Sequence, residues 1–372
     1  MVVALVASLF ASGSAVAAPG VDARIGAYRF ADGSLAALVV STGSLRLVEY
    51  DSGALRSLRA QSRDLYVGGP GVSVPSPIRV RVRLEPGGVI RVDGLAAARV
   101  DLVSRDLWFV DGDIRLEGRL LRPPGAGPFP AVVIVPGSEQ AHRTTYDLWA
   151  YFFAAHGFAV LTYDKRGVGG SGGTYDPAAT LPNLRLLASD ALAGVAWLRR
   201  QGVVDRSRIG LCGGSQAGWV IELAASRSSA VRFAALQSGP AMSVGRQLAY
   251  ARVTRQGWLD PPPSDAAIAQ ALAGVPDSGF DPRAILTSLR IPMLWQLGSV
   301  DKRMDTPETV ADLRSIAADG RHRFTVRVYP GGAHSLRLTA NGLIREERAS
   351  PGFVPGVFRD LASWLRSRVP AR

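Results

Sequence analysis

The sequence is poor in cysteine, histidine and lysine, and these scarcities narrow the chemistry that the chain can perform. It has 372 residues and a single cysteine, Cys212, which excludes an intramolecular disulfide framework. Four histidines without paired ligand spacing do not predict a structural zinc site, and we expect no metal and no other cofactor. Because Cys212 lies in a short apolar run, we interpret it as a buried apolar side chain rather than a reactive thiol.

Positive charge is abundant but is not clustered. The formal net charge is +12, a balance that can indicate nucleic acid or an anionic membrane surface as a partner. Lysine occurs only at Lys165 and Lys302, so nearly all of this charge is arginine, scattered singly among small and apolar residues. No basic run is interleaved with aromatic residues, and no nucleic-acid-binding motif is present. We therefore predict no nucleic-acid partner and interpret the charge chiefly as compositional bias, with weak attraction to anionic surfaces second.

Long hydrophobic runs are absent after the first residues. The segment 1–18 has an apolar core, then small residues and an A-x-A pattern at 15–17, which is typical of a secretory signal peptide. No Lys or Arg precedes the apolar core, so either translation begins further upstream or the amino terminus supplies the only charge. The segment is short for a membrane span. We predict an exported protein, periplasmic or secreted, without stable membrane insertion after cleavage.

Residues 19–110 contain no histidine or cysteine, and therefore no obvious metal or nucleophilic chemistry. Short β-like runs alternate there with Gly, Asp and Ser turns, which predicts a small antiparallel β domain, a meander or partial barrel. The region is too short for a propeller of several four-stranded blades. We interpret it as a structural or positioning module. Its clearest predicted strands are Leu35–Val40, Leu45–Tyr50, Ile78–Leu84, Val89–Val92 and Leu102–Val110.

From residue 111 onward, apolar strands alternate with helical segments. Ala131–Val135 is a continuous apolar run of the kind found in strands that are buried on both faces of a parallel sheet. The rhythm of strand and helix predicts a doubly wound, mostly parallel α/β sheet over 111–372, closed by an amphipathic helix at Val354–Val369. The other predicted strands are Ile114–Leu121, Ala159–Tyr163, Arg208–Cys212, Phe233–Gln237, Pro292–Leu297 and Phe324–Tyr329.

A candidate nucleophile, Ser215, lies between the predicted strand Arg208–Cys212 and a predicted helix from Gln216. This order is that of a nucleophile elbow, in which a strained turn exposes a serine hydroxyl above the sheet edge. Glycine is favoured two positions either side of the serine, where a Cβ atom would meet neighbouring elements. Gly213 meets this requirement, whereas the downstream position is Ala217, so the motif is G-x-S-x-A. Since glycine-flanked serines are common in loops, the local match leaves a structural interpretation open.

Three segments together resemble a known superfamily. V-P-G-S at 135–138, Y-D-K-R-G-V-G-G-S-G-G at 163–173 and C-G-G-S-Q-A-G at 212–218 resemble the α/β-hydrolases, in particular bacterial esterases and serine aminopeptidase-like hydrolases. The resemblance extends from about residue 111 to the C-terminus. The second segment lacks the Gly-Lys-Ser/Thr ending of a phosphate-binding loop. In the family it shapes the rim of the active site, which implies a structural and not a catalytic role.

The resemblance implies an acid and then a histidine after the serine, each on a loop that follows a later strand. Asp301 follows the predicted strand Pro292–Leu297 directly, and Asp305 is the competing choice four residues on. His334 lies in the loop after the last predicted strand. The expected catalytic residues are therefore Ser215, Asp301 and His334. Another histidine, His142, follows the first central strand and either contacts substrate or is an exposed loop residue, which we favour.

The chemistry implied is acyl transfer. His334 would take the proton of Ser215 as it attacks a carbonyl, Asp301 would orient the imidazole, and the backbone N–H groups of Gln216 and Ser138 would form the oxyanion hole. The stretch of about 240–290 occupies the position of the family's lid or cap. Tyr250 and Trp258 within it are candidate pocket walls, although core packing is the favoured interpretation of both.

We predict a serine hydrolase that cleaves carboxylic esters of small molecules. A peptidase or a thioesterase of the same superfamily is the alternative, because a Ser-His-Asp triad does not distinguish esters from amides. From another class, the chain could be a binding protein on a hydrolase scaffold, with its function in the β domain. Nothing in the sequence specifies an oligomeric state.

Overall fold

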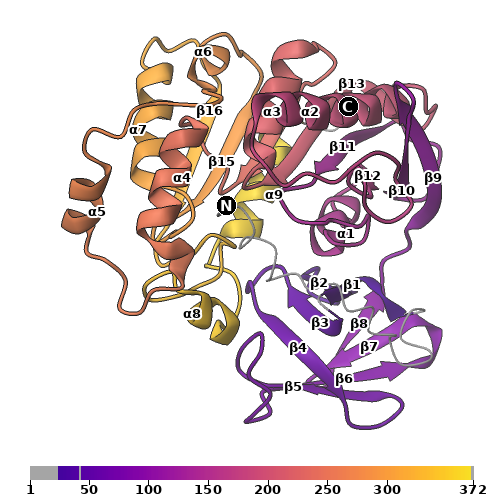
Figure 1. The fold of residues 1–372 in the computed structure, drawn as a ribbon. Coiled ribbons are helices and arrows are strands. Elements are labelled where there is room, and N and C mark those ends of the chain that lie inside the picture. Colours follow the sequence, from indigo (N-terminus) through magenta and orange to yellow (C-terminus); the bar gives the residue numbers. More distant parts are fainter. Residues whose placement is uncertain (1–23, 42, 370–372) are drawn as a thin grey trace.

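The computed structural model describes residues 24–41 and 43–369, so the predicted signal peptide lies outside the described residues. The chain forms two sheets, and the first of them is a closed antiparallel barrel in which strands neighbour one another in chain order and β8 returns to β1 (Figure 1). This confirms the small N-terminal all-β domain. Its strands are β1 (Gly26–Phe30), β2 (Leu35–Ser41), β3 (Ser44–Glu49), β4 (Leu55–Ala60), β5 (Leu65–Gly68), β6 (Val80–Glu85), β7 (Val89–Val92) and β8 (Leu95–Arg99).

The barrel packs on the rest of the molecule through outward-facing side chains of several strands, and β2 shows the pattern most clearly. Successive side chains of a strand point to opposite faces. Accordingly, Ala36 and Leu38 belong to the barrel's interior cluster, whereas Ala37 and Val39 belong to a cluster shared with helices of the second unit. The continuous apolar sequence of β2 is explained by burial on both of these faces.

Tyr50, just after β3, joins the two units. Its hydroxyl donates a 2.6 Å hydrogen bond to the carbonyl oxygen of Leu148, and its ring packs edge-on against Phe152 and Phe358. Phe152 lies on α1 (Asp147–Ala155) and Phe358 on α9 (Val357–Arg368). The barrel therefore packs against α1 and α9, the two helices that cover one face of the large sheet.

The second sheet has eight strands in the order β16-β15-β14-β13-β11-β12-β10-β9. Strands β11 to β16 are parallel, and β9 and β10 form an antiparallel edge. Residues 102–110, which the sequence analysis placed in the N-terminal domain, fall mainly in β9 of this sheet. The strands are β9 (Val103–Asp111), β10 (Ile114–Arg122), β11 (Phe129–Val135), β12 (Ala159–Tyr163), β13 (Val204–Gly214), β14 (Phe233–Gln237), β15 (Met293–Gly298) and β16 (Phe324–Tyr329).

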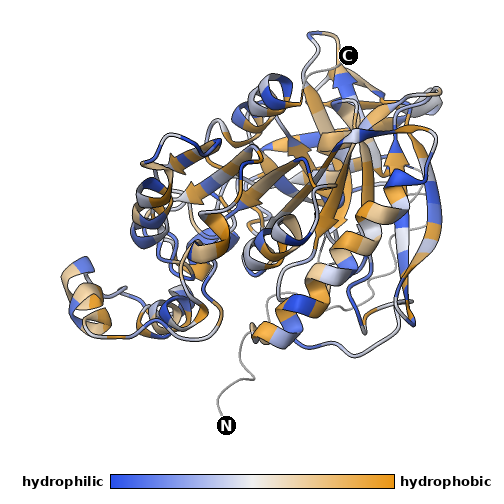
Figure 2. Ribbon diagram, turned by 90° about the horizontal axis from the view of Figure 1, so that it is seen from above, coloured by the Kyte–Doolittle hydropathy of each residue, from blue (hydrophilic) through white to orange (hydrophobic). Residues whose placement is uncertain are grey.

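Helices cover both faces of this sheet, as the prediction of a doubly wound α/β fold requires. α2 (Leu181–Arg199), α3 (Ala217–Arg227) and α7 (Thr306–Ala317) contribute to one apolar cluster, and α1 and α9 to the other. Figure 2 shows the central strands mostly hydrophobic, as expected of strands buried on both sides. Among the described residues, no helix combines the length and the apolar character needed to cross a membrane.

The stretch between β14 and β15 contains α4 (Val244–Val253), η3 (Arg255–Gly257), α5 (Asp265–Leu272) and α6 (Arg283–Leu286). Arg246 of α4 forms an ion pair with Glu308 of α7 at 2.8 Å, which ties this insertion to the element that follows β15. Tyr250 is buried, as the packing interpretation expected. For Trp258 that interpretation is wrong, because the side chain is 53% exposed and lies against Arg348 rather than in the core.

Candidate active site

Ser215 occupies the sharp turn between β13 and α3. Its φ of 57° lies in the left-handed region, which costs a residue with a Cβ atom about 1–2 kcal/mol and often marks a functional site. The turn is held on both sides: the Ser215 N–H donates to the Gln237 carbonyl at 3.0 Å, and its carbonyl accepts from the Gly218 N–H at 2.8 Å. A strained serine is thus fixed at the carboxyl edge of the sheet.

Close packing around the elbow explains its departure from the usual motif. A Cβ atom at Gly213 would lie 2.6 Å from the Val135 carbonyl oxygen and 2.7 Å from the Cβ of Ala217. Because Gly213 leaves this space empty, Ala217 can carry its methyl group. The residue that must lack one is Gly218, where a Cβ atom would lie 2.9 Å from the Cα of Gly239.

His334, in the loop after β16, is paired with Asp301, in the loop after β15. Nδ1 of His334 lies 2.8 Å from Oδ2 of Asp301. The other carboxylate oxygen accepts backbone N–H groups from Arg303 at 2.7 Å and Met304 at 3.0 Å, and the Asp301 side chain is fully buried. The competing Asp305 instead caps α7 by accepting the Glu308 N–H at 3.0 Å. Geometry therefore selects Asp301 as the histidine's partner.

The serine and the histidine are anchored to consecutive residues at the end of β14. Ser215 is bound through the Gln237 carbonyl, and the hydroxyl of Ser238 donates to the His334 carbonyl at 2.8 Å. Within the described part of the chain the Ser215 hydroxyl has no hydrogen bond, so the structure pairs the acid with the histidine and leaves the serine hydroxyl unpaired. Hydrogen bonds to nucleophiles are often long before substrate binds.

The two expected oxyanion donors also lie at this edge. Gln216 precedes α3, so its backbone N–H is at the positive end of the helix dipole. Ser138 follows β11, and its carbonyl oxygen accepts the hydroxyl of Tyr175 at 2.6 Å. Among backbone hydrogen bonds of the described residues, neither of these two N–H groups takes part. Both are therefore available to a ligand.

The comparisons with known proteins agree with this geometry. Residues 111–259 match the family model of the X-Pro dipeptidyl-peptidase (S15 family). Esterase FrsA of Enterobacter sp. (strain 638) is 36% identical over 75 residues, which are 20% of this chain and 18% of that esterase, so the match covers less than a fifth of the curated relative.

Two solved structures share the fold. The Pyrococcus furiosus esterase Pf2001 is 16% identical with a TM-score of 0.52, and the match covers 72% of this chain and 91% of that one. Pyrococcus horikoshii acylaminoacyl peptidase is also 16% identical, with a TM-score of 0.51 over 90% of this chain and 54% of its own.

The chain has the α/β-hydrolase fold. Its strand order and its elbow after β13 agree with this fold, which confirms the resemblance carried by the three sequence segments.

Sequence reasoning missed one residue of this α/β-hydrolase site. Lys165, in the Gly-rich segment to which only a structural role was assigned, is buried, and its Nζ donates to the Gly137 carbonyl at 2.5 Å and to Oε1 of Gln216 at 3.3 Å. Burial lowers the pKa of Lys165 to about 8. The available signal was its rarity, since the chain has only two lysines.

Three titratable groups near the site have simpler explanations. Burial raises the pKa of Glu139, although Lys165 and His334 oppose the shift, and the carboxylate accepts the Tyr146 hydroxyl. His142 is exposed, which agrees with the favoured loop interpretation, and it lines a polar groove of about 350 Å³ with residues of β9 and β10. Burial raises the pKa of Cys212 to about 12, as expected of an inert buried thiol.

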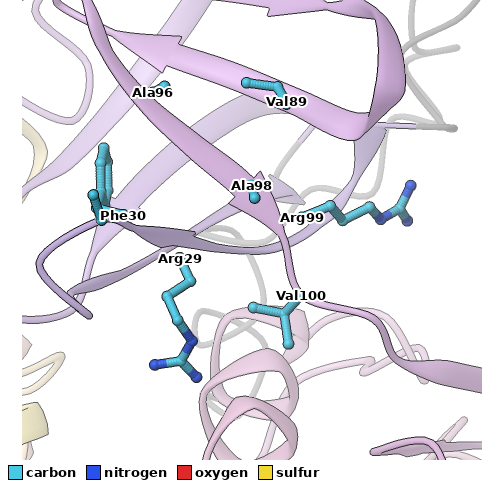
Figure 3. Close-up of a pocket in the computed structure, with 8 residues that line it drawn as sticks. Arg29, Phe30, Val89, Ala96, Ala98, Arg99 and Val100 are labelled. Atoms are coloured by element: carbon cyan, nitrogen blue, oxygen red, sulfur yellow. The ribbon is translucent and has the colours of Figure 1, made fainter.

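The barrel carries a cavity of a different kind. With a volume of about 480 Å³, it lies on the barrel's outer surface and is lined mainly by small and apolar side chains such as Val89, Ala96 and Ala98, with two arginines at its margin (Figure 3). No carboxylate, histidine or hydroxyl lines it. The cavity thus offers no group for nucleophilic or acid–base chemistry, and the reactive residues of the described chain gather on the large sheet.

Proposed function

We propose that this protein is a serine hydrolase that cleaves carboxylic esters, with Ser215 as nucleophile. The observation that carries the proposal is the 2.8 Å contact between His334 and Asp301 beside the elbow that holds Ser215. A strained serine after β13, a buried carboxylate after β15 and a histidine after β16, all at one edge of the sheet, are the parts that acyl transfer requires.

The proposed mechanism assigns one role to each group. The Nδ1–H of His334 donates to Asp301, which leaves Nε2 unprotonated as the general base. His334 takes the hydroxyl proton as Ser215 Oγ bonds to the carbonyl carbon, and the resulting oxyanion is bound by the N–H groups of Ser138 and Gln216. Collapse breaks the ester C–O bond, and His334 returns the proton to the leaving alcohol. Water, activated in the same way, then releases the acid and restores Ser215.

The comparisons support a hydrolase of the esterase or peptidase type. Esterases are among the matched relatives, while the family model and the acylaminoacyl peptidase favour a second candidate, a peptidase with the same mechanism. Amide cleavage differs in one requirement, because the leaving amine must receive a proton from His334 before it departs.

Parallel assays separate the candidates. We would measure kcat/KM for p-nitrophenyl butyrate, for an aminoacyl p-nitroanilide and for an X-Pro p-nitroanilide, with Ser215→Ala as the control. An esterase hydrolyses the ester with at least about 100-fold higher kcat/KM than either amide; comparable amide turnover would favour the peptidase. Fluorophosphonate labelling with peptide mapping should find one adduct, on Ser215, and its absence from the folded protein would contradict both candidates.

A further inference from the structure

The ammonium group of Lys165 lies where three segments of the candidate site meet. Its Nζ donates to the carbonyl oxygen of Gly137, on the loop after β11, and to the side-chain oxygen of Gln216, at the start of α3. It also lies 5.3 Å from the centre of the Tyr175 ring. The residue is only 1% exposed, so these contacts replace water as the solvation of the charge.

The contact with Gly137 acts directly on an oxyanion donor. The carbonyl of Gly137 and the N–H of Ser138 belong to the same planar peptide group and point in opposite directions. A positive charge bound at the oxygen draws electron density away from the nitrogen, so the Ser138 N–H becomes a stronger donor. The charge also fixes the direction in which this N–H points, which is away from Lys165.

The contact with Gln216 fixes the second donor. The Gln216 side chain accepts from Lys165 through Oε1 and donates through Nε2 to the Pro177 carbonyl at 2.8 Å. With both ends of its amide bound, the residue cannot rotate freely, and its backbone N–H keeps its direction at the helix start. Tyr175 adds a further restraint through its hydrogen bond to the Ser138 carbonyl.

We propose that Lys165 is a positioning residue that aligns both backbone donors of the oxyanion hole, and polarises that of Ser138, from the side opposite the substrate. The inference rests on the proposed hydrolase function. Lys165 need not touch substrate, because it acts through the Gly137–Ser138 peptide and through Gln216. Stabilisation by pre-oriented donors is often the largest single contribution to acyl transfer, and a misaligned donor loses much of it.

The charge on Lys165 should itself depend on pH. Four groups face it: Glu139 from the loop after β11, Tyr175 and Asp176 from the loop after β12, and Asp190 from α2. Burial lowers the pKa of Lys165 to about 8, against the opposing effect of the three carboxylates. The ammonium form predominates below this pH. Polarisation of the Ser138 donor, and kcat with it, should therefore fall as pH rises through about 8.

Steady-state kinetics of Lys165→Met on p-nitrophenyl butyrate, from pH 6 to 10, tests the proposal. Direct removal of an oxyanion donor costs about 100- to 1,000-fold in kcat, so an indirect loss should cost about 10- to 100-fold with KM within about twofold. The decline of kcat above pH 8 should disappear in Lys165→Met. Lys165→Arg, which keeps the charge at every pH tested, should lose the decline but retain more activity. Lys302→Met, the same change at the other lysine, should keep the wild-type profile.

The outcomes separate the two proposals. If the wild-type protein hydrolyses neither esters nor amides and fluorophosphonate does not label Ser215, the hydrolase function itself is contradicted. If the wild type is labelled and active but Lys165→Met keeps its kcat and pH profile, only the role of Lys165 is overturned. If circular dichroism shows that Lys165→Met does not fold, the wild type and Lys165→Arg provide the test. The proposed role of Lys165 is overturned if the wild-type kcat stays constant from pH 7 to 10. It is also overturned if the decline at pH 8 persists in Lys165→Arg.

Discussion

At the scale of single residues, the pairing of His334 with Asp301 makes the sharpest prediction about activity. Asp301→Asn keeps the size of the side chain but replaces a carboxylate that orients the imidazole and stabilises its protonated form, so kcat should fall by about 1,000- to 10,000-fold. Asp305→Asn is the matched control, because Asp305 only caps α7 and its loss should cost at most about 1 kcal/mol of stability. Ester-hydrolysis kinetics of both variants check this, and a larger loss in Asp305→Asn would assign the acid to Asp305.

The sequence predicted which residues lie at this edge of the sheet better than it predicted their contacts. Ser215, Asp301 and His334 could be proposed because the α/β-hydrolase resemblance implies a serine, an acid and a histidine in this order, and each of them follows a recognisable apolar strand. The role of Lys165 depends on Gly137 and Gln216, which are distant in sequence and meet it only in the fold. No local sequence pattern predicts such a contact.

At the scale of elements, α3 contains a buried acid that the proposed mechanism does not use. Glu222 is fully buried, and neither carboxylate oxygen has a hydrogen-bond partner among the described residues. Burial, with a smaller contribution from Asp281, raises the pKa of Glu222 well above its usual value. The folded protein therefore holds this proton while the unfolded chain releases it near pH 4.5, and stability should fall as pH rises from there, by up to about 1.4 kcal/mol per pH unit.

Thermal unfolding of Glu222→Gln from pH 4 to 8 tests whether ionisation of Glu222 lowers stability as pH rises. The variant cannot ionise, so its melting temperature relative to wild type should rise steadily above pH 4.5 and change little below it. Glu346→Gln, on α8 (Ile344–Ala349), should differ, because hydrogen bonds from Asn341 and Leu343 outweigh partial burial and lower the pKa of Glu346. Its melting temperature relative to wild type should rise only as pH falls below about 4.5 and should stay constant above that pH. A Glu222→Gln difference that does not vary with pH would mean that the folded protein ionises Glu222.

Strands were more predictable than their partners. Ala159–Tyr163, Phe233–Gln237 and Phe324–Tyr329 were located to the residue, since apolar runs bounded by turn residues leave little choice of boundary. Closure of the barrel was not predicted, because it depends on pairing β1 with β8, whose sequence L-A-A-A-R has little strand preference. The membership of β9 in the large sheet was missed for a different reason: its strand was predicted, but its hydrogen-bond partner, β10, is set by the fold.

At the scale of the whole molecule, the barrel and the α/β unit share one hydrophobic cluster, and they should therefore unfold together. Tyr50→Ala removes the hydrogen bond to Leu148 and the contacts with Phe152 and Phe358, so it should lower stability by about 3–5 kcal/mol. Calorimetry should show one transition for wild type and a separate, earlier melting of the barrel in Tyr50→Ala. Leu95→Ala, on an exposed side chain of β8, should change stability by less than about 0.5 kcal/mol.

Ester hydrolysis by Tyr50→Ala well below its first transition should keep its wild-type kcat, because Ser215 and His334 are held by β13, β14 and β16 and not by the barrel. Two separate transitions in the wild-type protein would show instead that the shared cluster does not couple the units.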